Sequence, residues 1–281
     1  MPTPGKRGET SPPEPRKTLE RVLSKAGLGS RTEARGWIHA RRVSVNGRII
    51  ENPDHWVYFR RDRVALDGRP LEPARKRYLL LYKPCGYLTT YHDPAGRPTV
   101  YDLLAGVEQF VAPVGRLDLN TSGLLLLTND TQLAEALTNP KRHVPKIYLV
   151  KTATRLSDDA EEQLRQGVLL DDGPARPAQL RRVRDSATKT FLEITLTEGR
   201  NRQVRRMIEA VGSRVLKLVR IQFGPLTLGQ LPVGQFRELS PDEVRMLKQV
   251  TNVQGRAAGG LPHPGNLAVR KGSGDPRRHR S

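Results

Sequence analysis

The chain has 281 residues, enough for two or more domains, and its 48 Lys and Arg against 29 Asp and Glu give a net charge of +19. This excess of positive charge indicates a polyanionic partner, and nucleic acid is the usual one. The sequence shows no long apolar run and no signal peptide, so we expect no membrane partner. The single cysteine, Cys85, excludes an internal disulfide and suits a cytoplasmic protein.

Patterns typical of metal and nucleotide sites do not occur in the sequence. Cys-x-x-Cys, His-Glu-x-x-His and P-loop spacings are all missing. The acidic turn Asp171-Asp172-Gly173 has no nearby residues that would complete the coordination of a metal. We therefore expect no metal site, and a nucleotide-dependent enzyme is disfavoured.

The two ends of the chain have compositions that do not support a packed core. Residues 1–16 hold five prolines among scattered charges, and residues 250–281 are rich in Gly, Pro and Arg. Such segments cannot bury enough apolar surface to offset the entropy lost on folding. We expect both to be disordered, and the basic C-terminal one to add non-specific affinity for RNA.

Residues 17–65 are predicted to form a small α/β module. A helical apolar period is followed by a second helix, which begins at a capping box made by Ser30 and Glu33. Asn46-Gly47 between apolar residues is a strong signal for a hairpin. A short charged linker is predicted over residues 66–77.

Residues 78–249 are predicted to form a larger module of strands and helices. The apolar runs Tyr78–Tyr82 and Leu124–Leu127 predict buried strands, and the alternation from Leu192 to Leu196 predicts a half-buried one. Asp130 is placed to cap a helix directly after the second of these strands.

An Arg and an Asp two positions apart, Arg116 and Asp118, precede the predicted strand Leu124–Leu127. A carboxylate on a rigid loop that enters a buried strand is partly desolvated, and a flanking Arg can help to keep it ionised. The alternative interpretation is a structural Asp118 that caps the loop through its backbone.

A basic segment follows Glu198-Gly199. If residues 202–211 are helical, Arg202, Arg205 and Arg206 share one face and apolar side chains share the opposite face. An ordinary solvated basic face is the alternative interpretation.

Residues 115–130 resemble the catalytic motif of RNA pseudouridine synthases. The most similar branch modifies ribosomal RNA and carries an N-terminal S4 domain (the RsuA/RluB type). Lys146-Ile147-Tyr148 and Glu198–Met207 match two further motifs of the family. The S4 resemblance rests on Ser30-Arg31, Arg41-Arg42-Val43 and Val45-Asn46-Gly47, and the whole match covers residues 17–248.

The resemblance implies an α+β fold. A small S4-like α/β RNA-binding domain would precede a pseudouridine-synthase domain whose mixed, mainly antiparallel sheet is flanked by helices. The implied reaction isomerises a specific uridine to pseudouridine and needs no cofactor. The sequences of residues 93–100 and 118–126 resemble more closely the branch of the family that modifies large-subunit ribosomal RNA, so this RNA, free or in an assembly intermediate, is the expected substrate. We expect the protein to be a monomer.

The resemblance also implies roles for single residues. Asp118 is expected to be the essential carboxylate, paired with Arg205, while Tyr148 offers a face for the uracil and a hydroxyl for proton transfer. Arg116 is expected to fill the space left by the extruded base or to hold a phosphate. The other candidates for RNA contacts are Arg31, Arg35, Arg41, Arg42, Asn46, Arg200 and Arg202.

Three alternatives stay open at this point. A non-catalytic S4-type RNA- or ribosome-binding protein accounts for the charge and the first module, but it leaves Asp118, Tyr148 and Arg205 unexplained. A hydrolytic nucleosidase or glycosidase would need a second catalytic carboxylate in a matching motif. Within the family, small-subunit ribosomal RNA or transfer RNA is the other possible substrate.

Overall fold

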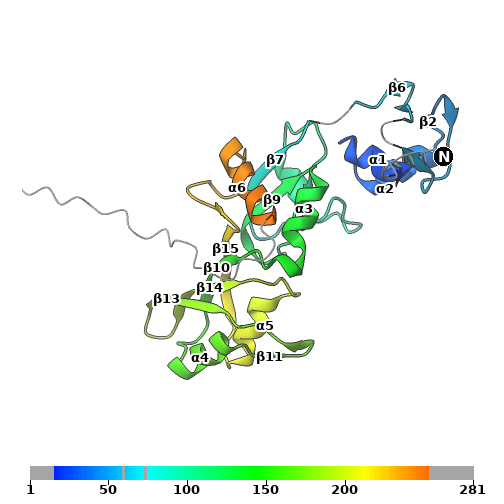
Figure 1. The fold of residues 1–281 in the computed structure, drawn as a ribbon. Coiled ribbons are helices and arrows are strands. Elements are labelled where there is room, and N and C mark those ends of the chain that lie inside the picture. Colours follow the sequence, from blue (N-terminus) through cyan, green and yellow to red (C-terminus); the bar gives the residue numbers. More distant parts are fainter. Residues whose placement is uncertain (1–15, 59–60, 73–74, 253–281) are drawn as a thin grey trace, which may run out of the picture.

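The computed structural model describes residues 16–58, 61–72 and 75–252. Figure 1 shows a small N-terminal body, coloured blue, and a larger body that contains the rest of the described chain. The predicted disordered tails fall mainly on residues 1–15 and 253–281, which lie outside the described residues.

The small body packs two helices, α1 (Leu19–Lys25) and α2 (Arg31–His39), on short strands. The capping box of Ser30 and Glu33 is present, and Asn46 and Gly47 have the positive φ values, 52° and 80°, of a tight hairpin turn. One sheet has the order β3-β2-β5-β6, and β1 pairs with β4. The bounds are β1 Arg16–Thr18, β2 Val43–Val45, β3 Arg48–Ile49, β4 Trp56–Tyr58, β5 Val64–Leu66 and β6 Arg69–Pro70.

The structure corrects three predicted boundaries by a few residues. Strand β6 pairs with β5, so the small body continues past residue 65 into the segment that was predicted as a linker. Arg16 belongs to β1 and is not part of a disordered tail. Helix α6 runs Pro241–Asn252, beyond the predicted end at residue 249, and its Thr251 is buried.

The large body is organised around a nine-stranded sheet whose main order is β13-β14-β10-β15-β9-β7-β17. Strands β15 and β9 are parallel and the other pairings are antiparallel, as predicted for a mixed, mainly antiparallel sheet. The bounds are β7 Tyr78–Lys83, β8 Ala112–Pro113, β9 Ser122–Thr128, β10 Lys146–Thr152, β13 Gln179–Asp185, β14 Thr190–Leu196, β15 Val215–Phe223, β16 Leu226–Thr227 and β17 Phe236–Glu238.

Helices flank this sheet and complete the α+β fold that the sequence predicted. Helices α3 (Thr131–Thr138) and α6 pack together over one part of the sheet, and α4 (Asp158–Gln166) and α5 (Gln203–Ala210) enclose a second core. Shorter elements are two 3₁₀ turns, Val100–Leu103 and Pro140–Arg142, and the pair β11 (Leu169–Leu170) and β12 (Gly173–Pro174).

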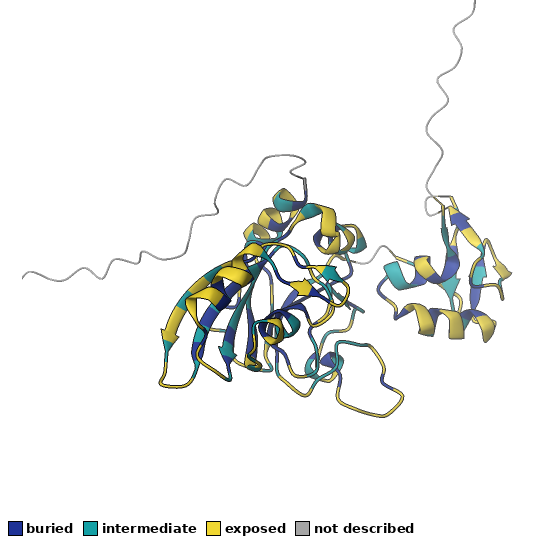
Figure 2. Ribbon diagram, turned by 90° about the horizontal axis from the view of Figure 1, so that it is seen from below, coloured by how far each residue is buried: buried dark blue, intermediate teal, exposed yellow. Residues whose placement is uncertain are grey.

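Strand β9 lies inside the sheet, between β15 and β7, with every residue buried, and Figure 2 shows buried strands inside the large body. Apolar residues on both faces of β9 are therefore required by its position, and the run Leu124–Leu127 was correctly predicted as a doubly buried strand. None of the helices in the described ranges has the length and apolar composition needed to cross a membrane.

Candidate active site

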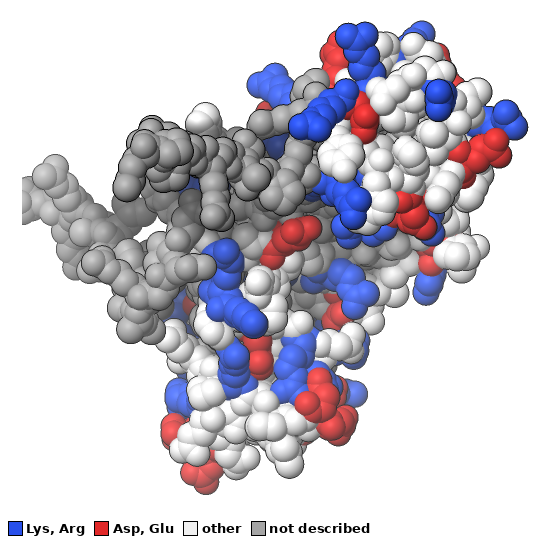
Figure 3. Space-filling model, turned by 45° about the vertical axis from the view of Figure 1, so that its right-hand side comes forward, with Lys and Arg blue, Asp and Glu red and all other residues white. Residues whose placement is uncertain are grey.

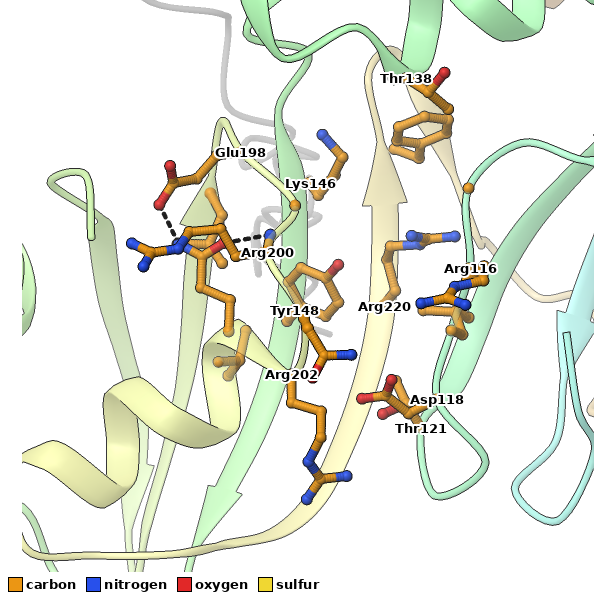
Figure 4. A pocket seen from close by; sticks show the side chains of 18 of the residues that line it. Arg116, Asp118, Thr121, Thr138, Lys146, Tyr148, Glu198, Arg200, Arg202 and Arg220 are labelled. Atoms are coloured by element: carbon orange, nitrogen blue, oxygen red, sulfur yellow. Dashed lines mark hydrogen bonds between the residues drawn. The ribbon is translucent and has the colours of Figure 1, made fainter. Parts of the chain in front are cut away.

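A cavity of about 390 Å³ lies over strands β10 and β15 of the large sheet. Five of the predicted site residues line it, namely Arg116, Asp118, Tyr148, Arg200 and Arg202. Figure 4 shows that they come from three separate segments: the loop before β9, strand β10 and the turn before α5. Three motifs that are distant in sequence therefore meet around one hollow.

The loop that carries Asp118 is held at every residue from Leu117 to Thr121, because each backbone oxygen accepts a hydrogen bond. Lys83 Nζ donates to the backbone oxygens of Asp118 (3.0 Å) and Thr121 (2.9 Å). The backbone oxygens between and before them accept from Thr89 Oγ1 (at Leu117, 2.7 Å), from the Gly86 amide (at Leu119, 2.8 Å) and from Arg205 Nη2 (at Asn120, 2.8 Å). A loop fixed in this way presents its side chains without reorganisation, which a catalytic group requires.

Lys83 is the central residue of this network, and the sequence did not point to it. Its side chain is 0% exposed, and its three N–H groups donate to the carbonyls of Pro84, Asp118 and Thr121. Burial lowers the pKa of Lys83 to about 8. A lysine at a strand end normally predicts a solvated side chain, so neither pattern nor composition revealed its burial.

The carboxylate of Asp118 is left available by this arrangement. The residue is half-buried and lines the cavity, and in the described part of the chain its side chain has no hydrogen bond or ion pair. Only its backbone oxygen takes part in the loop network, accepting from Lys83 and from the Thr121 amide. Within the described ranges, no cluster of three or more His, Cys, Asp or Glu side chains is arranged to hold a metal.

Arg205 lies beside the Asp118 loop but does not form the predicted ion pair with it. Its Nη2 donates to the Asn120 oxygen at 2.8 Å and to Thr121 Oγ1 at 3.5 Å, so the guanidinium binds the loop beyond Asp118. Burial, followed by the Arg202 charge, lowers the pKa of Arg205, and the Asp118 charge partly opposes this lowering. The direct pair is therefore a wrong prediction, and Arg205 is a residue that binds the Asp118 loop.

Tyr148 extends from β10 into the cavity and is half-buried. In register it pairs with Ile194 of β14 on one side and with Arg220 of β15 on the other. Lys146 lies two positions earlier on the same strand face and also lines the cavity. Burial, followed by the Arg220 charge, lowers the pKa of Lys146 to about 8. Neither Lys146 nor Arg220 was among the predicted site residues.

The arginines near α5 divide into two kinds. Arg200 is bound to the protein itself, because its guanidinium pairs with Asp172 and donates to the carbonyls of Gly173 and Pro174 at 2.9 Å. Arg206 pairs with the same Asp172, which lowers the pKa of that carboxyl. Arg202 and Arg116 are exposed at the cavity and have no ion pair in the described part of the chain. They are therefore better placed than Arg200 to meet an RNA phosphate.

The predicted RNA contacts of the small body do not line the cavity, and each has an acidic partner on the same body. Arg31 and Arg35 pair with Glu20, which is 1% exposed, while the others pair as Arg41–Glu51, Arg42–Asp67 and Asn46–Asp62. The arginine side chains remain 46% to 65% exposed, so each guanidinium still faces solvent. Figure 3 shows the result on one face of the molecule, where basic and acidic side chains alternate.

Two family models match the chain. The model for RNA pseudouridylate synthases matches residues 77–210, and the S4 domain model matches residues 18–57. The matched ranges fall within the large and the small body, respectively. The synthase model includes the Asp118 loop, Tyr148 and Arg205.

Similar proteins and a similar structure carry the same description. A ribosomal large subunit pseudouridine synthase B of Yersinia pestis is 39% identical over 87% of this chain and 79% of its own, and one of Bacillus subtilis is 37% identical over 83% and 96%. An RNA pseudouridine synthase of Aquifex aeolicus is 42% identical over 82% and 92%. A crystal structure of a pseudouridylate synthase superposes with a TM-score of 0.60, at 29% identity, over 82% of this chain and 99% of that one. The chain therefore belongs to the RNA pseudouridylate synthase family.

Proposed function

We propose that this protein isomerises one uridine of large-subunit ribosomal RNA to pseudouridine, with Asp118 as the essential carboxylate. The observation that carries the proposal is the unpaired Asp118 carboxylate, which faces a nucleotide-sized cavity from a loop bound at every backbone oxygen. The choice of RNA is supported by the relatives from Yersinia pestis and Bacillus subtilis, whose names specify the large ribosomal subunit.

The reaction is balanced without a cofactor. The bond from N1 of uracil to ribose C1′ breaks, the base turns, and C5 bonds to C1′. C5 then loses its proton and N1 gains one. Glycosyl chemistry of this kind uses a carboxylate as nucleophile, base or stabiliser of positive charge, and Asp118 is placed to supply it.

The neighbours of Asp118 have separate tasks in this proposal. The uridine must first leave its stack, which costs about a few kcal/mol, and Arg116 at the exposed rim fills the vacated space or holds a neighbouring phosphate. Tyr148 offers its ring to the extruded base and its hydroxyl to proton transfer at C5. Arg205 maintains the loop geometry and adds positive charge near the carboxylate.

Binding to the large RNA is assigned to the S4 body together with Arg202 at the cavity. The exposed guanidinium groups of Arg31, Arg35, Arg41 and Arg42 supply affinity and orientation through phosphates, without reading sequence. The proposed setting is a monomer in the cytoplasm that acts on ribosomal RNA or on an assembly intermediate.

A hydrolytic nucleosidase is less well supported by the same cavity. Its second carboxylate would have to be Glu198, which also lines the hollow. Glu198 accepts from the Arg176 amide at 3.1 Å and from Gln203, and Figure 4 shows it beyond Tyr148 from Asp118. A carboxylate engaged in this way is not positioned to activate water opposite Asp118.

The test is to incubate the protein with transcripts of large-subunit ribosomal RNA, small-subunit ribosomal RNA and transfer RNA. Pseudouridine is then mapped by chemical labelling and reverse-transcription stops. One new stop in the large-subunit transcript supports the proposal. A stop found only in small-subunit ribosomal RNA or transfer RNA would identify that RNA as the substrate instead. No stop in any RNA or ribosomal particle would favour a non-catalytic RNA-binding protein.

A further inference from the structure

Arg220 is a buried cation in the cavity, and the reaction described so far does not use it. The side chain is 3% exposed, and the residue lines the same hollow as Asp118 and Tyr148. Its Nε donates to the Leu124 oxygen at 2.8 Å, but its Nη2 is buried with no hydrogen-bond partner. In the described part of the chain Arg220 has no ion pair.

The surroundings of Arg220 increase the cost of this charge. Lys83 and Lys146 are close enough for the Arg220 charge to lower their pKa values, and Arg116 lines the same cavity. Burying a charge without a partner is strongly unfavourable. The guanidinium contacts the Leu124 oxygen and lies 5.3 Å from the centroid of the Phe223 ring, but it meets no anion in the described part of the chain. A buried guanidinium without an anionic partner therefore indicates that its counter-charge comes from the ligand.

The position of Arg220 in the sheet indicates which part of the ligand it meets. In register it lies between Tyr148 of β10 and Gly123 of β9, the residue that ends the Asp118 motif. Arg220 and Tyr148, whose ring is proposed to receive the uracil, are thus opposite residues on neighbouring strands and line the same cavity. A phosphodiester remains linked at both ends to RNA outside the cavity, whereas the extruded base is the part that enters it.

The chemistry supplies a negative charge at that place. When the N1–C1′ bond breaks, its electron pair remains on the base and is delocalised onto O2 and O4. The charge leaves the base again when C5 bonds to C1′ and the C5 proton is exchanged for one on N1. Attack of Asp118 on the base ring would also push electrons onto a uracil oxygen, so an anionic oxygen arises on either route.

We propose that Arg220 is a catalytic residue whose Nη2 donates to a carbonyl oxygen of the target uracil and stabilises the negative charge on the base. A charge-assisted hydrogen bond in a water-excluded site is strong, and it is preformed here because the guanidinium is already held by Leu124. The inference rests on the proposed isomerisation of uridine in RNA.

The test compares Arg220→Met and Arg220→Lys with the wild-type protein on the large-subunit transcript that it modifies. The single-turnover rate at saturating protein, the RNA dissociation constant as a function of salt, and the melting temperature are measured. Arg184→Met is the matched control, since Arg184 is exposed and lies over Phe191, outside the cavity.

Arg220→Met should lower the rate by roughly 100- to 1,000-fold, the usual effect of losing one donor to a developing anion. The dissociation constant and its salt slope should not change, and the melting temperature should equal or exceed that of the wild type because an unpaired buried charge is gone. Arg220→Lys should recover part of the rate, and the control should match the wild type.

Several results would overturn the assignment. An unchanged rate, or a rate loss that only follows a lower melting temperature, would leave Arg220 without a chemical role. Weaker binding with a salt slope reduced by about one, at a normal saturated rate, would assign Arg220 to a phosphate. A wild-type protein that modifies no RNA would instead refute the proposed function.

Discussion

Lys83 donates a 3.0 Å hydrogen bond from its buried ammonium to the backbone oxygen of Asp118, a residue 35 positions later in the chain. A second bond, at 2.9 Å, reaches Thr121 at the other end of the same loop. The last residue of strand β7 thereby holds the loop that carries the carboxylate proposed to be catalytic. The active site is assembled by the backbone of the Asp118 loop as much as by its side chains.

Replacing Lys83 by Met should disrupt this loop. Hydrogen bonds to a charged group contribute about 1.5–3 kcal/mol each, so the loss of three, partly offset by the removal of a buried charge, should destabilise the protein by about 2–5 kcal/mol. Displacement of Asp118 should lower the isomerisation rate roughly 100-fold. Urea denaturation and single-turnover assays measure both effects, and Lys217→Met on exposed β15 surface is the control. A Lys83→Met variant that is as stable and as active as the wild type would show that the hydrogen bonds of Lys83 do not hold the Asp118 loop in place.

The same lysine should give a pH dependence of stability with a defined sign. Its pKa is about 8 in the folded protein and 10.5 in the unfolded chain, so the unfolded chain binds more protons between these values. The contribution of Lys83 to the free energy of unfolding therefore rises with pH across that window. The stability difference between wild type and Lys83→Met should widen from pH 7.5 to 9.5. A constant or shrinking difference would contradict the depressed pKa.

The predicted elements were correct where a pattern reflects a local physical rule. The Asn46-Gly47 hairpin and the Ser30 capping box follow from backbone geometry, and the strand over Leu124–Leu127 follows from its apolar run. Boundaries were less accurate. Strand β6 is only two residues long and pairs with β5 across the turn at residues 67–68, and the sequence pattern did not show that Thr251 near the end of α6 is buried.

The site was only partly predictable from the sequence, because two of its positively charged side chains are buried although their residue types are usually exposed. Lys83 and Arg220 are strand residues whose type normally indicates a solvated side chain. Their burial depends on carbonyl acceptors supplied by distant segments of the chain. The predicted Asp118–Arg205 ion pair was wrong for a related reason, since sequence spacing cannot show that the guanidinium reaches Asn120.

Gly123 should tolerate no side chain. Its φ is 117°, and a Cβ built there would overlap the backbone of Arg220 across the parallel pair of β9 and β15. Gly123→Ala combines backbone strain with a clash in the sheet centre and should destabilise the protein by about 2–5 kcal/mol. Gly36→Ala, in a helix with open space around it, should be neutral or stabilising. If the two variants unfold at the same denaturant concentration, the backbones of Gly123 and Arg220 are not as close as described here.

Arg116→Ala should affect RNA more than folding. Arg116 is exposed at the cavity rim and has no ion pair in the described chain, so its removal leaves no buried charge behind. RNA affinity should fall, and the slope of log affinity against log salt should decrease by about one if Arg116 holds a phosphate. Arg181→Ala, whose partner Glu193 lies on the neighbouring strand, serves as the control. Unchanged affinity and turnover would remove Arg116 from the proposal.

The central claim is that Asp118 performs the isomerisation, and Asp118→Asn tests it most directly. Asn keeps the size of the side chain and removes its charge, and the loop is held through backbone oxygens that the change leaves intact. The variant should therefore fold and bind the large-subunit transcript like the wild type. Pseudouridine mapped after incubation with both proteins should show one site with the wild type and none with Asp118→Asn. A variant that still forms pseudouridine at that site would contradict the account.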